Sequence, residues 1–184
     1  MISEYLKQHT AAYHDAAEKL FSSEKIFNKT FTLDDYKKII RTNYLMLLNS
    51  EEKINEHLSE EWAGKIDLGK RKKLPLIEKD MESLSLNVQE QAGDPLTFEN
   101  EHEALGALYV IEGSTLGGNV IAKQLSRTED FDGVTFHFFG CYQENTGPMW
   151  KNFKEELDSG VEEKDYDKVL SGARKLYAFL LNAD

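Results

Sequence analysis

The feature that most constrains the fold is an apolar segment, residues 104–125, which has helical spacing yet contains Gly106, Gly113, Gly117 and Gly118. Each glycine inside a helix costs about 1 kcal/mol relative to alanine, so packing or binding must offset the loss. Gly106, Gly113 and Gly117 fall within about 60° of one another on a helix and form a bare stripe. Such a stripe either lets a second helix approach closely or lets a flat ligand lie against the backbone, with the glycines permitting a bend.

The rest of the chain also favours helices. Only three prolines are present, so long helices are free to form. Thr32 and Asp35 resemble a capping box at a helix start. The run 134–139 has a strand-like composition but no partner strand, so we expect a loop or a helix start there. Apolar residues recur at helical spacing near residues 6–21, 36–48, 74–84, 150–157 and 169–180.

Composition narrows the class of protein. The chain has 184 residues, of which 40% are hydrophobic and 30% are charged, as in ordinary globular proteins. Breaks near residues 63–69, 91–95 and 140–147 do not resemble interdomain linkers. We therefore expect one all-α domain covering residues 1–184.

Charge and hydropathy exclude several partners. The formal net charge of −11 argues against nucleic acid, which requires a basic face. No apolar run approaches the roughly 20 residues that a membrane-spanning helix needs. The N-terminus lacks the basic and apolar regions of a secretory signal, and a single cysteine cannot form an internal disulfide. We expect a cytoplasmic protein with neither a membrane nor a nucleic-acid partner.

Two strings resemble those of a known family. Residues 106–118, GALYVIEGSTLGG, resemble the distal-helix signature of bacterial biliverdin-producing haem oxygenases. Residues 6–18, LKQHTAAYHDAAE, resemble the proximal helix of that family, and residues 36–52 and 150–154 occupy matching positions. The resemblance implies a multi-helical bundle in which haem lies between the proximal helix and a kinked distal helix.

The resemblance implies roles for residues of the proximal helix. Its Thr-x-x-x-His-x-x-x-Glu pattern corresponds to Thr10, His14 and Glu18. His14 would be the iron ligand, since neutral imidazole is a standard axial ligand of haem. Glu18 would orient the ring by accepting a hydrogen bond from its other nitrogen. Small alanines such as Ala17 leave room for a flat ring on this face.

Other histidines are weaker candidates for the iron ligand. His9 lies about 140° round the helix from His14, and we expect it to be solvated. His137, in an aromatic loop, is an alternative ligand. His57 and His102 lie among charged residues, and we expect both to be exposed.

On the distal side, the resemblance implies that Gly113 and Gly117 pack against the haem, with Gly118 beside them. At the position of Ser114 many haem oxygenases, notably the animal type, carry an aspartate that anchors a water network. A hydroxyl can relay a proton through water but cannot hold a negative charge. We expect Ser114 to order distal water, with proton delivery completed by backbone carbonyls.

Cationic and aromatic residues complete the expected site. Lys7 lies two turns before His14, about 10 Å along the axis, which is within reach of a haem propionate. A solvated lysine is an equally good interpretation. By resemblance, Lys151 and Lys154 follow a segment that lines the propionate edge. Aromatic side chains that could wall the pocket, or simply belong to the core, are Tyr44, Tyr109, Phe153 and Phe179.

The function that the resemblance implies is conversion of haem, dioxygen and electrons to biliverdin, ferrous iron and carbon monoxide. Haem b would be both substrate and cofactor. No flavin or nicotinamide motif is present, so an external donor such as a ferredoxin or flavodoxin would supply electrons. Such a donor would dock near Lys7, Lys151 and Lys154, and we expect a monomer or weak dimer.

Two alternatives stay open. A haem-binding protein for storage or sensing would use the same pocket without turnover. A thiaminase-type enzyme of similar helical architecture would need a cysteine nucleophile, and Cys141 is poorly placed for this by its spacing.

Overall fold

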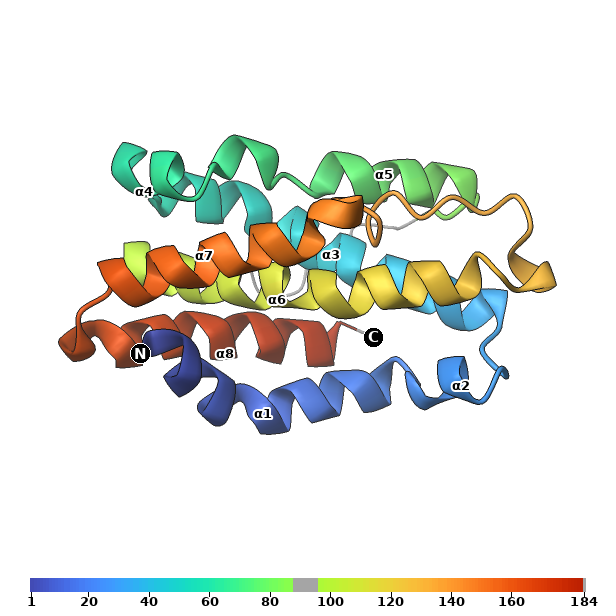
Figure 1. The fold of residues 1–184 in the computed structure, drawn as a ribbon, viewed down its shortest axis with the longest axis horizontal. Coiled ribbons are helices and arrows are strands. Elements are labelled where there is room, and N and C mark those ends of the chain that lie inside the picture. Colours follow the sequence, from blue (N-terminus) through green and yellow to red (C-terminus); the bar gives the residue numbers. More distant parts are fainter. Residues whose placement is uncertain (88–95, 184) are drawn as a thin grey trace.

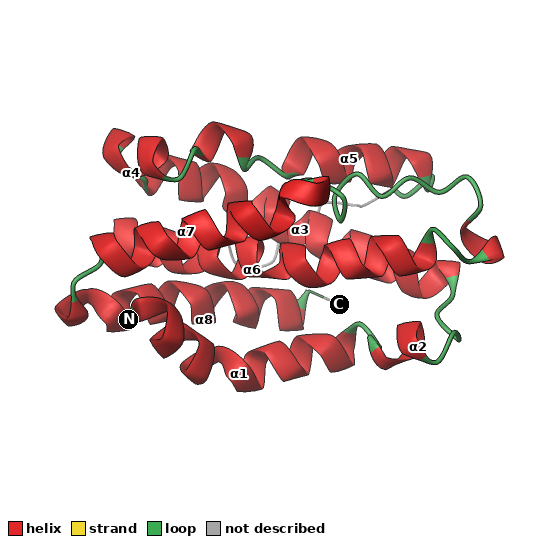
Figure 2. Ribbon diagram, viewed as in Figure 1, coloured by secondary structure: helices red, strands yellow, loops and turns green. Residues whose placement is uncertain are grey.

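The computed structural model describes residues 1–87 and 96–183, and within these ranges the regular structure is entirely helical (Figures 1 and 2). The expected all-α fold is confirmed. Residues 134–139 form a loop, and the expected break at 91–95 lies outside the described residues. The α-helices are α1 (Ile2–Leu20), α2 (Glu24–Phe27), α3 (Leu33–His57), α4 (Glu60–Lys65), α5 (Leu74–Ser83), α6 (Glu101–Leu125), α7 (Thr146–Gly160) and α8 (Tyr166–Asn182).

Local sequence signals set several helix starts. Thr32 caps α3 through the expected capping box: its hydroxyl accepts from the Asp35 N–H at 3.2 Å, and its own N–H donates to the Asp35 carboxylate at 2.9 Å. The Asn100 side chain caps α6 by accepting from the Glu103 N–H at 3.1 Å. Pro148 lies in the first turn of α7, where its missing N–H has no helical partner to lose.

The helices pack around α6. This helix packs on α8, α3 and α7, whereas α1 packs on α8 and α7, and α3 packs on α5. In Figure 1, α1 and α2 lie along one edge of the bundle and α4 and α5 along the other, with α6 and α8 between them. Among the described helices, none has both the length and the apolar character needed to cross a membrane.

The N-terminal half of α6 is fixed against α8 by a glycine crossing. A Cβ atom on Gly106 would lie 1.8 Å from the Val169 carbonyl oxygen, and one on Gly172 would lie 1.8 Å from the Glu103 carbonyl oxygen. No side chain fits at either position. Gly106 therefore serves close helix packing, the first of the two functions expected for the glycine stripe.

Candidate functional site

The C-terminal halves of α1 and α6 lie at the same end of the bundle (Figure 1). Within the described residues these two helices have no extended contact with each other, because each packs on α7 and α8 instead. On α6 this end carries two exposed apolar side chains, Leu116 (40% exposed) and Val120 (55% exposed). These two side chains are available to contact a ligand that lies against this part of α6.

His14 lies on the exposed side of α1. Its side chain is 62% exposed, and its Nδ1 atom lies 3.7 Å from the Glu18 carboxylate. That separation is too long for the hydrogen bond expected from Glu18, although it allows a charge interaction when His14 is protonated. Because Nδ1 faces Glu18, the Nε2 atom is the one available to bind a metal. Asp15 also belongs to this exposed group, whose potential ligand atoms lie within 4.8 Å of one another.

The other residues expected on α1 divide between core and surface. Thr10 is buried, and its hydroxyl donates to the Leu6 carbonyl at 2.8 Å, so its polar group is used inside the helix. Ala17 is also buried, next to the exposed His14 side of the helix. Lys7 is exposed.

Of the alternative ligands, His9 is exposed as expected, and its ring stacks on Tyr5 with centroids 4.1 Å apart. His137 is half-buried, and its backbone N–H donates to the Asp80 carboxylate at 2.9 Å. His137 therefore lies in a loop anchored to α5, the helix that carries Asp80.

The expectation of exposure was wrong for His57 and His102. Both rings are half-buried, because the helices that carry them pack against neighbouring segments. The His57 ring makes an edge contact with Phe98, and the His102 ring lies 3.7 Å from Asp165.

The three distal glycines have different surroundings. A Cβ atom on Gly117 would meet nothing within 4 Å, so this backbone is bare on the outer side of α6. A Cβ atom on Gly113 would lie 3.5 Å from the Trp150 indole, which is ordinary contact. Gly118 is buried, and its Cβ would lie 2.6 Å from the Phe139 ring. Gly118 thus permits close packing of Phe139, which is a different use from the ligand contact expected of it.

The hydroxyl groups beside these glycines bond to their own helix. Ser114 is exposed and donates to the Ile111 carbonyl at 2.7 Å, while Thr115 donates to the Glu112 carbonyl at 2.6 Å. The Ser114 proton is therefore engaged, and its lone pairs are what it can offer to water. Bonds of this kind accompany helix bending, yet α6 continues as one helix through all its glycines.

Trp150 brings most of the remaining expected residues together. Its ring lies 5.2 Å from that of Tyr109 and 6.1 Å from that of Phe153, and the Lys154 ammonium lies 5.4 Å above it. It also lies beside Gly113. Phe153 is fully buried, so it supports Trp150 from the core and has no surface left to contact a ligand. Sequence reasoning did not single out Trp150, although it opens the matched segment 150–154.

The remaining expected residues, Tyr109, Lys151, Tyr44 and Phe179, lie in different environments. Burial raises the pKa of Tyr109 to about 12, so its hydroxyl remains a hydrogen-bond donor at neutral pH. Lys151 is exposed and pairs with Glu155 at 3.6 Å, facing away from the core. Tyr44 and Phe179 are half-buried and pack at the edge of the core.

A buried charged cluster next to the glycines was missed from the sequence. Glu112, the residue before Gly113, contacts both Arg71 and Lys73, and all three side chains are at most 1% exposed. The Tyr142 hydroxyl lies 3.0 Å from the same carboxylate. The available signal was a lone carboxylate inside the apolar run 104–118.

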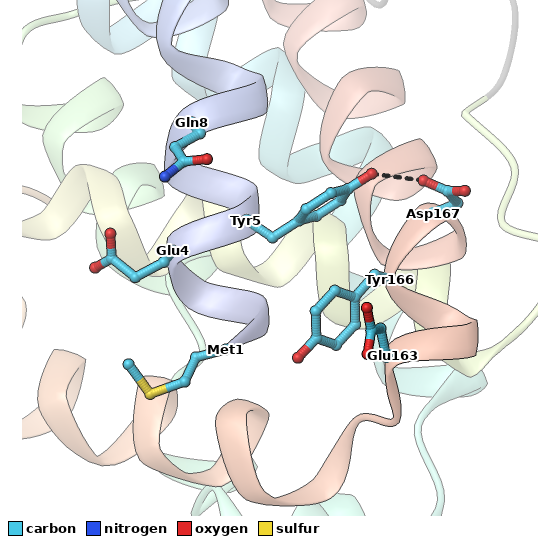
Figure 3. Close-up of a pocket in the computed structure, with 7 residues that line it drawn as sticks. All are labelled: Met1, Glu4, Tyr5, Gln8, Glu163, Tyr166 and Asp167. Atoms are coloured by element: carbon cyan, nitrogen blue, oxygen red, sulfur yellow. Dashed lines mark hydrogen bonds between the residues drawn. The ribbon is translucent and has the colours of Figure 1, made fainter.

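A separate groove lies at the N-terminal end of α1 (Figure 3). It has a volume of about 460 Å³, and the Tyr5 hydroxyl donates to Asp167 within it at 2.7 Å. Glu4 and Glu163 also line it, so this carboxylate-rich groove is poorly suited to an anionic ligand. It does not include His14 or the glycines of α6.

Comparisons with known proteins identify proteins that this chain is similar to. A curated protein named "Heme oxygenase" from Xanthomonas campestris pv. campestris (strain 8004) is 28% identical over 153 residues, covering 79% of this chain and 86% of the relative. The solved structure of the NO- and CO-bound haem oxygenase from Neisseria meningitidis matches with a TM-score of 0.78 and 21% identity, covering 98% of this chain and 88% of that one. This similarity shows that the two chains share a fold.

The family model described as "Heme oxygenase" matches residues 1–184. This match includes both the exposed histidine on α1 and the glycine segment of α6. The chain belongs to the haem oxygenase family.

Proposed function

We propose that this chain is a haem oxygenase that converts haem b, dioxygen and electrons to biliverdin, ferrous iron and carbon monoxide. The observation that carries the proposal is that the C-terminal half of α1, with exposed His14, and the C-terminal half of α6, with the bare Gly117 backbone, lie at the same end of the bundle. Family membership over residues 1–184 supports the catalytic interpretation and one functional domain.

The residues present fit haem as substrate. His14 offers an imidazole Nε2 to the iron, because its Nδ1 faces Glu18. Gly117 offers a surface without a side chain, and the exposed Leu116 and Val120 offer apolar contact to the macrocycle. Haem, once bound, supplies the oxidative chemistry itself.

The chain's own residues would bind haem and control its surroundings. Glu18 would come within hydrogen-bonding distance of Nδ1 and hold the His14 ring in one orientation. Ser114 would accept a hydrogen bond from water through its lone pairs, because its proton is engaged with the Ile111 carbonyl. Proton delivery would thus rest on water and backbone groups, without a carboxylate at position 114.

The propionate edge would be formed around Trp150. Lys154 lies over the Trp150 ring, which itself lies beside Gly113, and this favours Lys154 over Lys151 as a propionate partner. Tyr109 adds a phenol that stays protonated at neutral pH. Lys7, which is exposed on the same helix as His14, would be a second propionate partner, supplied by α1.

Electrons would come from an external donor such as a ferredoxin or flavodoxin. Because those proteins are acidic and this chain carries a net charge of −11, docking requires a local basic patch. The exposed Lys7 and Lys151, with Lys154, would supply it. We propose a cytoplasmic enzyme that acts as a monomer or weak dimer.

The test is a haemin titration followed at the Soret band. Wild type and His9→Ala, which removes an exposed histidine from the same helix, are expected to give the same spectrum. His14→Ala is expected to bind haem weakly or with altered ligation. Adding ascorbate or a reduced ferredoxin system should then bleach the Soret band and yield a bilin. An unchanged spectrum in His14→Ala would contradict the assignment of His14 as the iron ligand.

The same experiment separates the alternatives. A Soret band that persists with reductant and dioxygen would favour a storage or sensing protein. For a thiaminase-type enzyme, burial raises the pKa of the Cys141 thiol, which is unfavourable for a nucleophilic thiolate. Cys141→Ala is therefore expected to retain haem degradation at the wild-type rate.

A further inference from the structure

The buried cluster beside the distal glycines consists of four side chains that contact one another: Arg71, Lys73, Glu112 and Tyr142. Glu112, the residue before Gly113, contacts the Arg71 guanidinium and the Lys73 ammonium. The Tyr142 hydroxyl accepts from Lys73 at 3.0 Å and lies 3.0 and 3.2 Å from the two carboxylate oxygens of Glu112. Because a buried charge that loses its partners is strongly unfavourable, these side chains fix one another.

The cluster ties α6 to several other segments. Arg71 also donates to the Met149 carbonyl at 3.2 Å and to the Asn152 side chain at 3.0 Å, both on α7. The backbone N–H of Lys73 donates at 2.5 Å to Glu51, which lies on α3. The position of the α6 backbone at Glu112 is therefore set by contacts from α3, α7 and the segment before α5.

The loop 134–142 contacts α6 at two positions, one before Gly113 and one after Gly117. At one end Tyr142 bonds to Glu112, and further along α6 the Phe139 ring fills the space beside Gly118. Asp80 on α5 anchors this loop by accepting two of its backbone N–H groups, at 2.9 and 2.8 Å. The segment between the two contacts includes Gly117, where nothing packs against the outer side of the backbone.

We propose that Glu112 and Tyr142 are positioning residues that set where the Gly113–Gly117 backbone stands relative to the haem face. They act through the backbone and do not touch haem. The inference rests on the proposed function, because it assigns the purpose of the cluster to the distal side of that same site.

Tyr142→Phe is the informative variant, because it removes one hydroxyl and leaves the charged groups paired. Tyr36→Phe is the matched control: Tyr36 is fully buried, and its hydroxyl has no hydrogen-bond partner among the described residues. Glu112→Asp is a third variant, which keeps the charge but shortens its reach by one methylene. Circular dichroism verifies that each variant folds.

The first measurement is amide hydrogen exchange of residues 113–118 in the haem-free protein. Tyr142→Phe is expected to exchange about fivefold faster than wild type in this segment, because a contact that holds it is lost. Tyr36→Phe is expected to match wild type. Equal rates in the two phenylalanine variants would overturn the claim that the cluster holds the segment.

The second measurement is the pH titration of the Soret band of the ferric haem complex. The midpoint is the pH at which half of the spectral change is complete. In Tyr142→Phe it is expected to shift by about 0.3 pH units or more, which corresponds to about a twofold change in the proton dissociation constant. The shift in Glu112→Asp is expected to be larger. Faster exchange with an unchanged midpoint would reduce the cluster to a structural role. If wild type shows no His14-dependent Soret band, the proposed function fails and the haem-positioning role with it, while the exchange rates still report whether the cluster holds α6.

Discussion

The Nδ1 atom of His14 lies 3.7 Å from the carboxylate of Glu18, and both side chains are more than half exposed. The pair therefore contributes little to the stability of the fold, since exposed ion pairs are worth at most about 1 kcal/mol. Either residue can be replaced without disturbing the core, so a change in ligand binding would report on the site itself.

Glu18→Ala is expected to weaken haem binding by about 10- to 100-fold, because it removes the group that we propose orients the His14 imidazole. The free energy of unfolding of the haem-free protein should change by no more than about 0.5 kcal/mol. Haem titration and urea denaturation measure the two quantities. Asp15→Ala removes a neighbouring exposed carboxylate and is the control. Equal losses of affinity in the two variants would contradict an orienting role for Glu18.

Gly117→Ala is expected to stabilise the haem-free protein by about 0.4–1 kcal/mol, because alanine favours the helix and its methyl group meets no neighbour. The same methyl group should weaken haem binding. Gly106→Ala should instead destabilise by about 3 kcal/mol or more, since its Cβ would overlap the Val169 carbonyl. Urea denaturation compares the two, and a destabilising Gly117→Ala would show that the bare backbone is packed.

Lys154→Ala is expected to lower haem affinity about fivefold, which corresponds to loss of one partly exposed ion pair with a propionate. Lys151→Ala should have less effect, because Lys151 pairs with Glu155 on the outer side of α7. Haem dimethyl ester, which lacks propionate charges, provides the control. If Lys154→Ala weakens the ester as much as haem, the lysine acts by supporting Trp150 and not by charge.

Glu103 should make stability depend on pH. Burial opposes its ionisation, but hydrogen bonds from Lys175, the Glu99 N–H and Ser171 outweigh burial and hold its pKa below the usual 4.5. A lowered pKa means that the carboxylate stabilises the fold above pH 4.5 and that this stability is lost as pH falls through the lowered pKa.

Glu103→Gln tests that dependence. It should cost about 1–3 kcal/mol at neutral pH, as expected for a hydrogen-bonded buried charge. It should also flatten the decline in unfolding free energy as the pH falls below 4.5 and through the lowered pKa of Glu103. Urea denaturation across this range measures both effects. Parallel curves for wild type and variant would assign the acid sensitivity to other groups.

Much of the fold could be predicted from local signals. Helical spacing located the long helices, and the Thr32–Asp35 pattern located the start of α3. The spacing did not locate the helix ends as well: apolar spacing marks residues 36–48, but α3 continues to His57 because its buried face extends as far as Ile54. The half-buried His57 and His102 were misjudged for a related reason, since charged sequence neighbours do not reveal what packs from other helices.

The site was predictable where it depends on one helix and not where it depends on several. His14 and Glu18 share one helical face, so their spacing was enough to bring them together. The buried Arg71–Glu112 contact joins residues 41 positions apart, and no local pattern encodes it. Trp150 and Phe153 illustrate the same limit, because only packing decides which ring faces Gly113 and which is buried behind it.

The crossing of Gly106 and Gly172 has a consequence for how this enzyme can change. Neither position accepts even a methyl group, because each added Cβ would overlap a backbone carbonyl of the other helix, so both glycines must be retained for α6 and α8 to pack this closely. On α6, variation that reshapes the proposed site is therefore limited to the C-terminal half of the helix. A mutant library designed for a larger or smaller tetrapyrrole should keep these two glycines and randomise Leu116, Gly117 and Val120, the positions with free space outside them.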